Sequence, residues 1–225
     1  MKLALSLAFF VCGVLVRTYG KTTTTRPRLG SYGKTSTTAP RGRFHDSMTT
    51  AFPKDPSKND AMKVVEMNAT QWVKWRTYNL TDPFLGNPLQ CENFKVMKEI
   101  IPWNYTLQYS YRSGNSWLAR NETMVLEYLG ILPLAPNDMF FARTPLDPAT
   151  DNYVMYSNYV NCTVLRISVP SQGENHCDLW MANTTASEEP PLLCLENFER
   201  YCNTEHIFNV YLPNCTTGNT PVFFE

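Results

Sequence analysis

The sequence has little that could hold a metal, bind a phosphate or catalyse a reaction. Its three histidines are scattered, and no pair of cysteines has the close spacing of a zinc site. A GxSxG nucleophile elbow, a phosphate-binding loop and an HExxH metalloprotease motif are all missing. Beyond residue 16 there is no apolar run of the roughly 20 residues needed to span a bilayer. We therefore predict a protein without enzymatic activity, cofactor or metal.

The first 20 residues have the pattern of a secretory signal. Lys2 precedes an apolar run over 3–16, and small residues come just before Lys21. This run is shorter than a membrane span. We expect a signal peptide over 1–20 and a secreted, extracellular protein that does not associate with a membrane.

A change in composition near residue 50 separates a basic leader from an acidic domain. Residues 21–56 are rich in Thr and Pro and poor in aliphatic side chains, so burial cannot offset the entropy cost of ordering them. From Asp46 onward there are 12 basic and 20 acidic residues, and a surface of that sign does not suit nucleic acid. We predict a disordered leader over 21–56 and one domain over 57–225, long enough for a single core.

The cysteines and the glycosylation sequons agree with an extracellular location. Removing Cys12 with the signal leaves six cysteines, an even number that predicts disulfides, although the sequence alone does not choose their pairing. Seven Asn-X-Ser/Thr sequons are present. We expect glycans on six of them: Asn68, Asn79, Asn104, Asn121, Asn183 and Asn214.

Period-two alternation indicates strands through most of the domain. In 104–112, the side chains of Tyr105, Tyr109 and Tyr111 share one face, and polar side chains share the other. Asn104 belongs to a sequon and lies on the polar face, so we expect the tyrosines to point inward. Further strands are expected at 91–100, with Glu92 on a mostly apolar face, at 122–132, at 152–169 in a hairpin with 176–182, and at 207–214.

Two helices are expected beside these strands. One covers 60–67 with Asn59 or Asp60 as its cap, and the other begins at Pro190 and Pro191. This pattern predicts an all-β fold, an eight-stranded antiparallel barrel with a short N-terminal helix and a C-terminal helix packed outside. The interior of such a barrel can hold one small ligand. Periodicity alone does not exclude a β-sandwich.

The order "NCTVL…HCDLWM…PPLLCLENFERYC…IFNVYLPNC" resembles the tick salivary lipocalins of the histamine-binding group, over residues 60–215. The resemblance implies a lipocalin barrel, secreted in saliva, that sequesters host histamine, serotonin or a lipid mediator; some members bind complement proteins instead. We expect a monomer. The resemblance also implies three disulfides: Cys91–Cys215, Cys162–Cys194 and Cys177–Cys202.

The amine-binding pattern of this family has an Asp after one cysteine and, further on, a Glu before Leu and an aromatic residue. Here Thr163 takes the place of the Asp and Asp178 that of the Glu, with Trp180 as the aromatic residue. If Cys162 and Cys177 point outward, Thr163 and Asp178 point inward, because strand side chains alternate. We predict that Asp178 pairs with a protonated amine beside Trp180.

Other side chains are expected around that carboxylate. The three tyrosines form either an aromatic wall for a cation or only barrel core, and Glu92 is a second inward acid. Asp178 could instead be a solvated rim residue or a partner of Arg166. The same alternation turns Asn161 inward, so we expect its sequon to be unmodified. The predicted ligand-binding residues are Asp178, Trp180, Thr163, Tyr105, Tyr109, Tyr111 and Glu92.

Three functions remain open. The leading hypothesis is sequestration of histamine or serotonin, which would suppress host inflammation and haemostasis. The second is capture of a leukotriene or thromboxane, which inward-facing basic residues would favour; Arg76, Lys98 and Arg112 are available, with Arg112 predicted on the outer face. The third is inhibition of a complement or clotting protein through loops, which a barrel without a cavity would favour.

Overall fold

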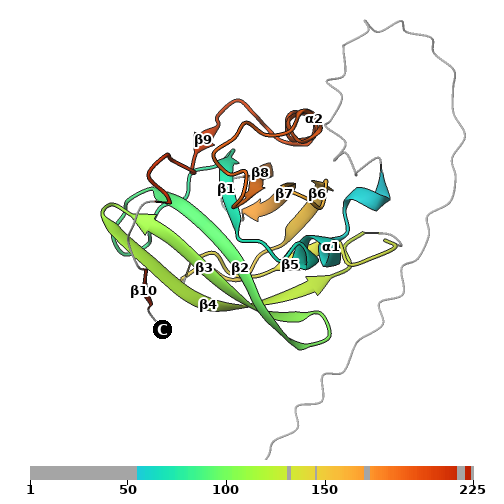
Figure 1. The fold of residues 1–225 in the computed structure, drawn as a ribbon, viewed down its shortest axis with the longest axis horizontal. Helices are drawn as coiled ribbons and strands as arrows, with labels where there is room; N and C mark the ends of the chain where they lie inside the picture. Colours follow the sequence, from blue (N-terminus) through green and yellow to red (C-terminus); the bar gives the residue numbers. More distant parts are fainter. Residues whose placement is uncertain (1–54, 131–132, 145, 170–172, 217–220, 224–225) are drawn as a thin grey trace, which may run out of the picture. The chain divides into compact units, whose positions relative to one another are not determined.

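Eight strands form a closed antiparallel barrel in the computed structural model, which describes residues 55–130, 133–144, 146–169, 173–216 and 221–223 (Figure 1). Each strand pairs with the next, and β1 pairs with β8 to close the barrel, so the predicted fold is confirmed. The predicted signal peptide and nearly all of the predicted leader lie outside the described residues. The strands are β1 (Gln71–Arg76), β2 (Leu89–Ile101), β3 (Asn104–Ser113), β4 (Ser116–Glu127), β5 (Asp138–Phe140), β6 (Asn152–Ser157), β7 (Cys162–Val169) and β8 (Gly173–Ala182).

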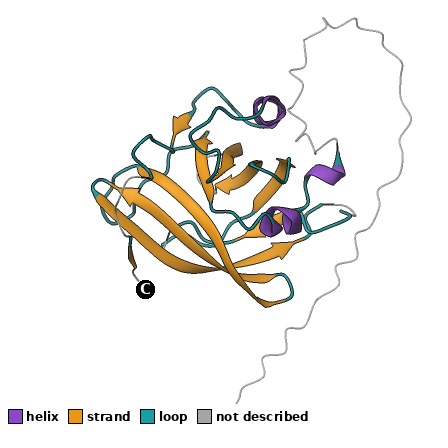
Figure 2. Ribbon diagram, viewed as in Figure 1, coloured by secondary structure: helices purple, strands orange, loops and turns teal. Residues whose placement is uncertain are grey.

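Short helices and strands accompany the barrel (Figure 2). The carboxylate of Asp60 caps α1 by accepting hydrogen bonds from the N–H groups of Met62 and Lys63. Helix α2 packs outside the barrel against β6, β7 and β8. Among the described residues no helix is long and apolar enough to cross a membrane. These elements are η1 (Pro56–Lys58), α1 (Ala61–Glu66), α2 (Leu192–Tyr201), β9 (Phe208–Asn209) and β10 (Val222–Phe223).

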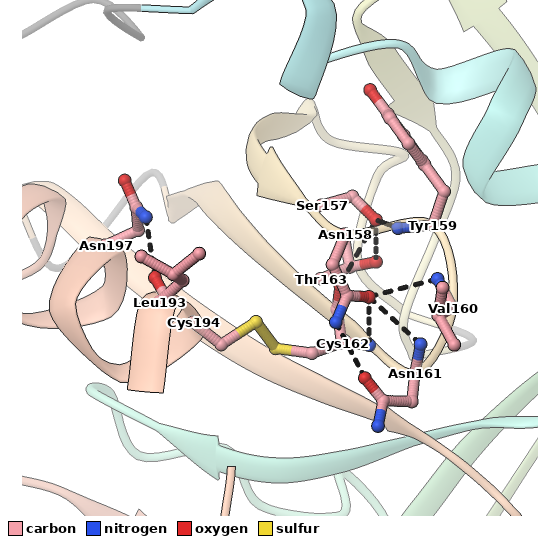
Figure 3. Close-up of a disulfide and its surroundings, with 10 residues drawn as sticks. All are labelled: Ser157, Asn158, Tyr159, Val160, Asn161, Cys162, Thr163, Leu193, Cys194 and Asn197. Carbon is pink, nitrogen blue, oxygen red and sulfur yellow. Dashed lines mark hydrogen bonds between the residues drawn. A yellow bond between two sulfur atoms is a disulfide. The ribbon is translucent and has the colours of Figure 1, made fainter. Parts of the chain in front are cut away.

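The expected strand over 152–169 is wrong in extent, because it is divided into β6 and β7 by a turn (Figure 3). The side-chain oxygen of Asn158 accepts hydrogen bonds from the N–H groups of Val160, Asn161 and Cys162, each at 3.0 Å. A side chain that satisfies the backbone in this way competes with the sheet and favours a turn.

Two other strands also differ in extent from the prediction. The strand expected over 122–132 begins earlier and is β4, which ends at Glu127. The strand expected over 207–214 shrinks to β9. It stops there because the N–H groups of Val210 and Tyr211 both turn to the carbonyl of Lys74, which ends a regular ladder.

Three disulfides fasten the C-terminal part of the chain to the barrel. Cys91 on β2 pairs with Cys215, Cys162 on β7 pairs with Cys194 on α2, and Cys177 on β8 pairs with Cys202 at the end of α2. These are the pairs that the resemblance implies. Disulfides of this kind suit an extracellular protein.

The alternation of side chains places the cysteines outside and their neighbours inside. Cys162, Val164, Cys177 and Leu179 pack with Phe198 of α2 in an outer cluster. The barrel interior holds the alternate residues of the same strands, together with the aromatic side chains of β2 and β3. Thr163 and Asp178 are completely buried. The interior cluster includes Phe94, Leu107, Tyr105, Tyr109, Tyr111, Leu165, Ile167 and Trp180.

Asn161 lies in the turn before β7, so the strand alternation does not determine its direction. Its side-chain oxygen accepts a hydrogen bond of 2.7 Å from the amide of Asn158, and the residue is half-buried (Figure 3). That its sequon carries no glycan stays a prediction. It now rests on this amide pair rather than on the inward direction we expected.

Asp138, where β5 meets β4 and β6, gives a prediction about stability. Burial raises the pKa of this carboxyl to about 8, with contributions from the nearby Asp151 and Glu127 and against the lowering effect of backbone hydrogen bonds. The unfolded chain loses this proton near pH 4 and the folded chain near pH 8, so the free energy of unfolding falls as the pH rises between them. We expect a fall of about 2 kcal/mol from pH 6 to 8.

The variant Asp138→Asn should lose this fall, because its side chain is neutral at every pH. Thermal melts of both proteins from pH 5 to 9 measure the effect. Glu199→Gln, which changes an exposed residue of α2, is the control and should behave like the parent. Parallel pH profiles for the parent and Asp138→Asn would contradict this assignment.

Candidate functional site

Four charged side chains meet inside the barrel, and all are buried. Arg76 on β1 forms an ion pair with Glu92 on β2. Arg143, which follows β5, lies with its Nη1 atom 3.0 Å from Oε1 of Glu92 and 2.7 Å from Oδ2 of Asp178 on β8. The charges therefore alternate in sign from Arg76 to Glu92, Arg143 and Asp178, and the four side chains together carry no net charge. Buried charges persist only when they are paired in this way.

The local backbone explains why Glu92 points inward. The preceding Cys91 has a positive φ of 52°, and the pairing of β2 with β3 shifts register between Gln90 and Asn93. Such a bulge re-aims the side chains beyond it. In the same way, the register of β1 against β8 shifts between Val73 and Trp75, after which Arg76 lies opposite Asp178.

Arg143 is held on its other side by Asn152. The side-chain oxygen of Asn152 accepts hydrogen bonds from Nε and Nη2 of Arg143, at 3.1 and 2.6 Å. The amide nitrogen of Asn152 donates to the carbonyls of Met139 and Thr150, at 2.8 Å each, which fixes its orientation. The guanidinium is thus bonded on every edge, and only 5% of the side chain is exposed.

Three aromatic rings surround the same guanidinium. Its carbon atom lies 5.4 Å from the ring centres of Phe94 and Phe141 and 6.0 Å from that of Trp180. Phe94 stacks on Trp180 at 4.5 Å, and the indole N–H of Trp180 donates to Oδ2 of Asp178 at 3.1 Å. Ring faces carry negative potential and attract cations, so this is a cation site made of two carboxylates and three aromatic rings.

The acid–base properties of the cluster keep its charges in place. Burial alone would lower the pKa of Arg143, but the nearby Asp178, Tyr78 and Tyr109 raise it above its ordinary value. Burial raises the pKa of Tyr78 to about 12, against the lowering effect of Arg143, and it also raises the pKa of Tyr109. The phenols therefore remain neutral and the guanidinium remains charged at physiological pH.

The structure brings together some of the residues predicted as a site. Asp178, Trp180 and Glu92 form the cation site, and Tyr109 stacks on Phe94 at its edge, 4.9 Å between ring centres. The proposed partnership of Asp178 with Arg166 is wrong, because Arg143 takes that place and Arg166 lies over the ring of Tyr153. Asp178 is also not a solvated rim residue, because it is completely buried.

The side chains of the remaining predicted residues make their polar contacts outside the cation site. Thr163 pairs with Trp180 in the β7–β8 ladder, but its hydroxyl lies 3.0 Å from that of Ser157. The hydroxyl of Tyr105 donates to the sulfur of Met62 on α1, at 3.3 Å, and that of Tyr111 donates to Asp82, at 3.0 Å.

The sequence pattern missed Arg143, Phe141 and Asn152. Arg143 and Phe141 lie between β5 and β6, outside the strands whose alternation gave the other inward residues, so no periodic signal identifies them. Asn152 begins β6 inside the segment expected as a single strand.

A cavity of about 20 Å³ remains between α1 and Trp180, enough for about one water molecule. Within the described ranges no group of three or more His, Cys, Asp or Glu could hold a metal.

Comparisons with known proteins agree with this architecture. A model of the family described as "Tick histamine binding protein" matches residues 51–217. The solved structure of the AM182 serotonin complex is similar, with a TM-score of 0.53 and 15% identity, covering 69% of this chain and 91% of that one. A comparison with curated proteins finds no match.

Two further solved structures are similar at lower scores. Japanin from Rhipicephalus appendiculatus, bound to cholesterol, has a TM-score of 0.42 and 12% identity, covering 71% of this chain and 97% of that one. Lobster apocrustacyanin A1 has a TM-score of 0.44 and 11% identity, covering 74% of this chain and 93% of that one. The matched family and the lipocalin fold are those of ligand-binding proteins rather than enzymes.

Proposed function

Because the chain belongs to the tick histamine-binding protein family, we propose that it is a secreted scavenger that sequesters a biogenic amine inside its barrel. Histamine and serotonin are the candidate ligands, and their removal would suppress host inflammation and haemostasis. The amine would bind at Asp178 and Glu92, between the rings of Phe94, Phe141 and Trp180. The function requires capture and no chemical step.

The observation that carries this proposal is the cation site itself. Two carboxylates and three aromatic rings converge on one position, where the structure places a guanidinium. An ammonium there would form charge-assisted hydrogen bonds of about 1.5–3 kcal/mol each, and the rings would add about 0.5–2 kcal/mol. The similarity of the fold to that of AM182, solved in complex with serotonin, is in keeping with an amine ligand.

A second candidate is an anionic lipid mediator such as a leukotriene, and the inward arginines favour it. Arg76 and Arg143 are both buried, and Nε and Nη1 of Arg76 have no hydrogen-bond partner among the described residues. A carboxylate ligand could use those donors. It would, however, meet Glu92 and Asp178 beside the arginines, and aromatic faces repel anions. The amine therefore remains the leading proposal.

Calorimetry on the mature glycosylated protein tests the choice, with histamine, serotonin and leukotriene C4 as ligands. Saturable binding of an amine and not of the leukotriene supports the scavenger of amines. Binding of leukotriene C4 alone supports the second candidate. Failure of all three would contradict both and favour inhibition of a host protein through the loops, the function that the nearly filled interior, with its cavity of about 20 Å³, also favours.

A further inference from the structure

Arg143 occupies the position that the proposed function assigns to the amine. Its Nη1 atom bridges the carboxylates of Glu92 and Asp178, as a ligand ammonium would. The carbon atom of its guanidinium lies within 6.0 Å of the centres of three aromatic rings, where a ligand ring would lie. We propose that Arg143 is an internal ligand of the cation site, that a captured amine binds by displacing it, and that it thereby determines which cations the barrel accepts. This inference rests on the proposed function.

The amine and Arg143 cannot occupy this position together. Both would need the same two carboxylate oxygens, and two cations a few ångströms apart in a buried site repel each other strongly. The cavity of about 20 Å³ beneath α1 is too small for histamine. The side chain of arginine, in contrast, is similar to histamine in size, so its departure would free a volume of the right order.

Arg143 is the member of the cluster best placed to leave. Arg76, Glu92 and Asp178 lie within strands of the barrel, whereas Arg143 follows the three-residue strand β5. After β5 the chain pairs with the segment before β6 by an isolated bridge between Phe141 and Thr150, and the carbonyl of Ala142 accepts a hydrogen bond from Arg120. Leu146, three residues further on, is 65% exposed. Few backbone bonds would therefore break if Arg143 moved toward solvent.

The contacts that Arg143 would lose define the class of ligand that can replace it. To compensate for losing Arg143, a ligand needs an N–H-bearing cation for the two carboxylates and a flat ring for Phe94, Phe141 and Trp180. Arylalkylamines such as histamine and serotonin have both features. An alkylamine lacks the ring, and a quaternary ammonium lacks the N–H donors that Nη1 supplies. We therefore expect the barrel to select arylalkylamines over both.

Replacing Arg143 by Met tests this inference, because Met has no charge or N–H groups to hold it between the two carboxylates and its flexible side chain can give way to a ligand. Titration calorimetry and stopped-flow tryptophan fluorescence would compare the parent with the variant, using histamine and serotonin. We expect Arg143→Met to bind at least tenfold tighter. The observed association rate should reach a plateau at high amine concentration in the parent, where Arg143 must leave first, and should rise linearly in the variant.

Two further variants serve as controls. Arg143→Lys keeps a buried cation, and so guards against a folding defect, but it lacks the fork that holds Asn152; we expect an intermediate affinity. Arg166→Met removes an arginine that lies over Tyr153, 5.2 Å from the ring centre, and should bind as the parent does.

The outcomes separate this inference from the proposed function. If the parent binds an amine and Arg143→Met binds it equally or more weakly, Arg143 is not a competitor, although the amine function stands. If only Arg143→Met binds, Arg143 closes the site and no amine displaces it, so the proposed function and the displacement both fail for the natural protein. If the parent, Arg143→Met and Arg143→Lys all fold and none binds an amine, the proposed function fails and the inference fails with it.

Discussion

Replacing Asp178 by Asn should weaken the binding of histamine and serotonin by at most one to two orders of magnitude, because Arg143, which the amine displaces, loses the same partner. The substitution keeps the shape of the side chain and removes the charge that pairs with the ammonium. A charge-assisted hydrogen bond contributes about 1.5–3 kcal/mol, and each 1.4 kcal/mol corresponds to about tenfold in affinity. Calorimetric titration of the parent and the variant measures the difference directly.

The control for this prediction is Asp147→Asn. Asp147 is exposed and accepts a hydrogen bond from Thr144, so it belongs to the same part of the chain as Arg143 but not to the cation site. We expect its affinity for amines to equal that of the parent. If Asp178→Asn also binds as tightly as the parent, the carboxylate does not hold the ligand and the proposed site is wrong.

Replacing Glu92 by Gln should destabilise the folded protein by about 3–5 kcal/mol. Glu92 bonds to both Arg76 and Arg143 and is completely buried. Without its charge, Arg76 loses its ion-pair partner and Arg143 retains only Asp178. The penalty for burying an uncompensated guanidinium is far larger than the value of the hydrogen bond lost. Urea unfolding at pH 7 gives the change in the free energy of unfolding.

Lys63→Gln is the matched control, because Lys63 also belongs to an ion pair, with Asp60 at 3.7 Å. The side chain of Lys63 is 51% exposed, so water and salt screen the pair. We expect a loss of about 1 kcal/mol or less. Equal losses in the free energy of unfolding for the two variants would contradict the account, because they would show that burial does not make the interior ion pairs more important than an exposed one.

The strands of this protein are readable from its sequence because each has one inward and one outward face. Alternation placed Asp178, Trp180 and Glu92 inside the barrel and the cysteines outside it, which is how the structure has them. The limits of the strands were harder to predict. The segment over 152–169 alternates like one strand, but the side-chain oxygen of Asn158 interrupts it. The turn is visible only in the structure, from the three hydrogen bonds that this oxygen accepts.

The partner of Asp178 could not be predicted from periodicity. Arg143 follows β5 in an irregular segment, where spacing along the chain gives no direction for a side chain. Its position depends on the tertiary fold, which brings it to Glu92, distant by 51 residues in the sequence. The sequence therefore identified the acids of the site but could not show that a cation of the same chain already binds them.

A crystal structure of the protein with serotonin would test the central claim most directly. We expect the ammonium of serotonin within hydrogen-bond distance of Asp178 and Glu92, with its ring against Phe94 and Trp180 and the side chain of Arg143 withdrawn. Serotonin bound only outside the barrel, with Arg143 still between the two carboxylates, would contradict the account.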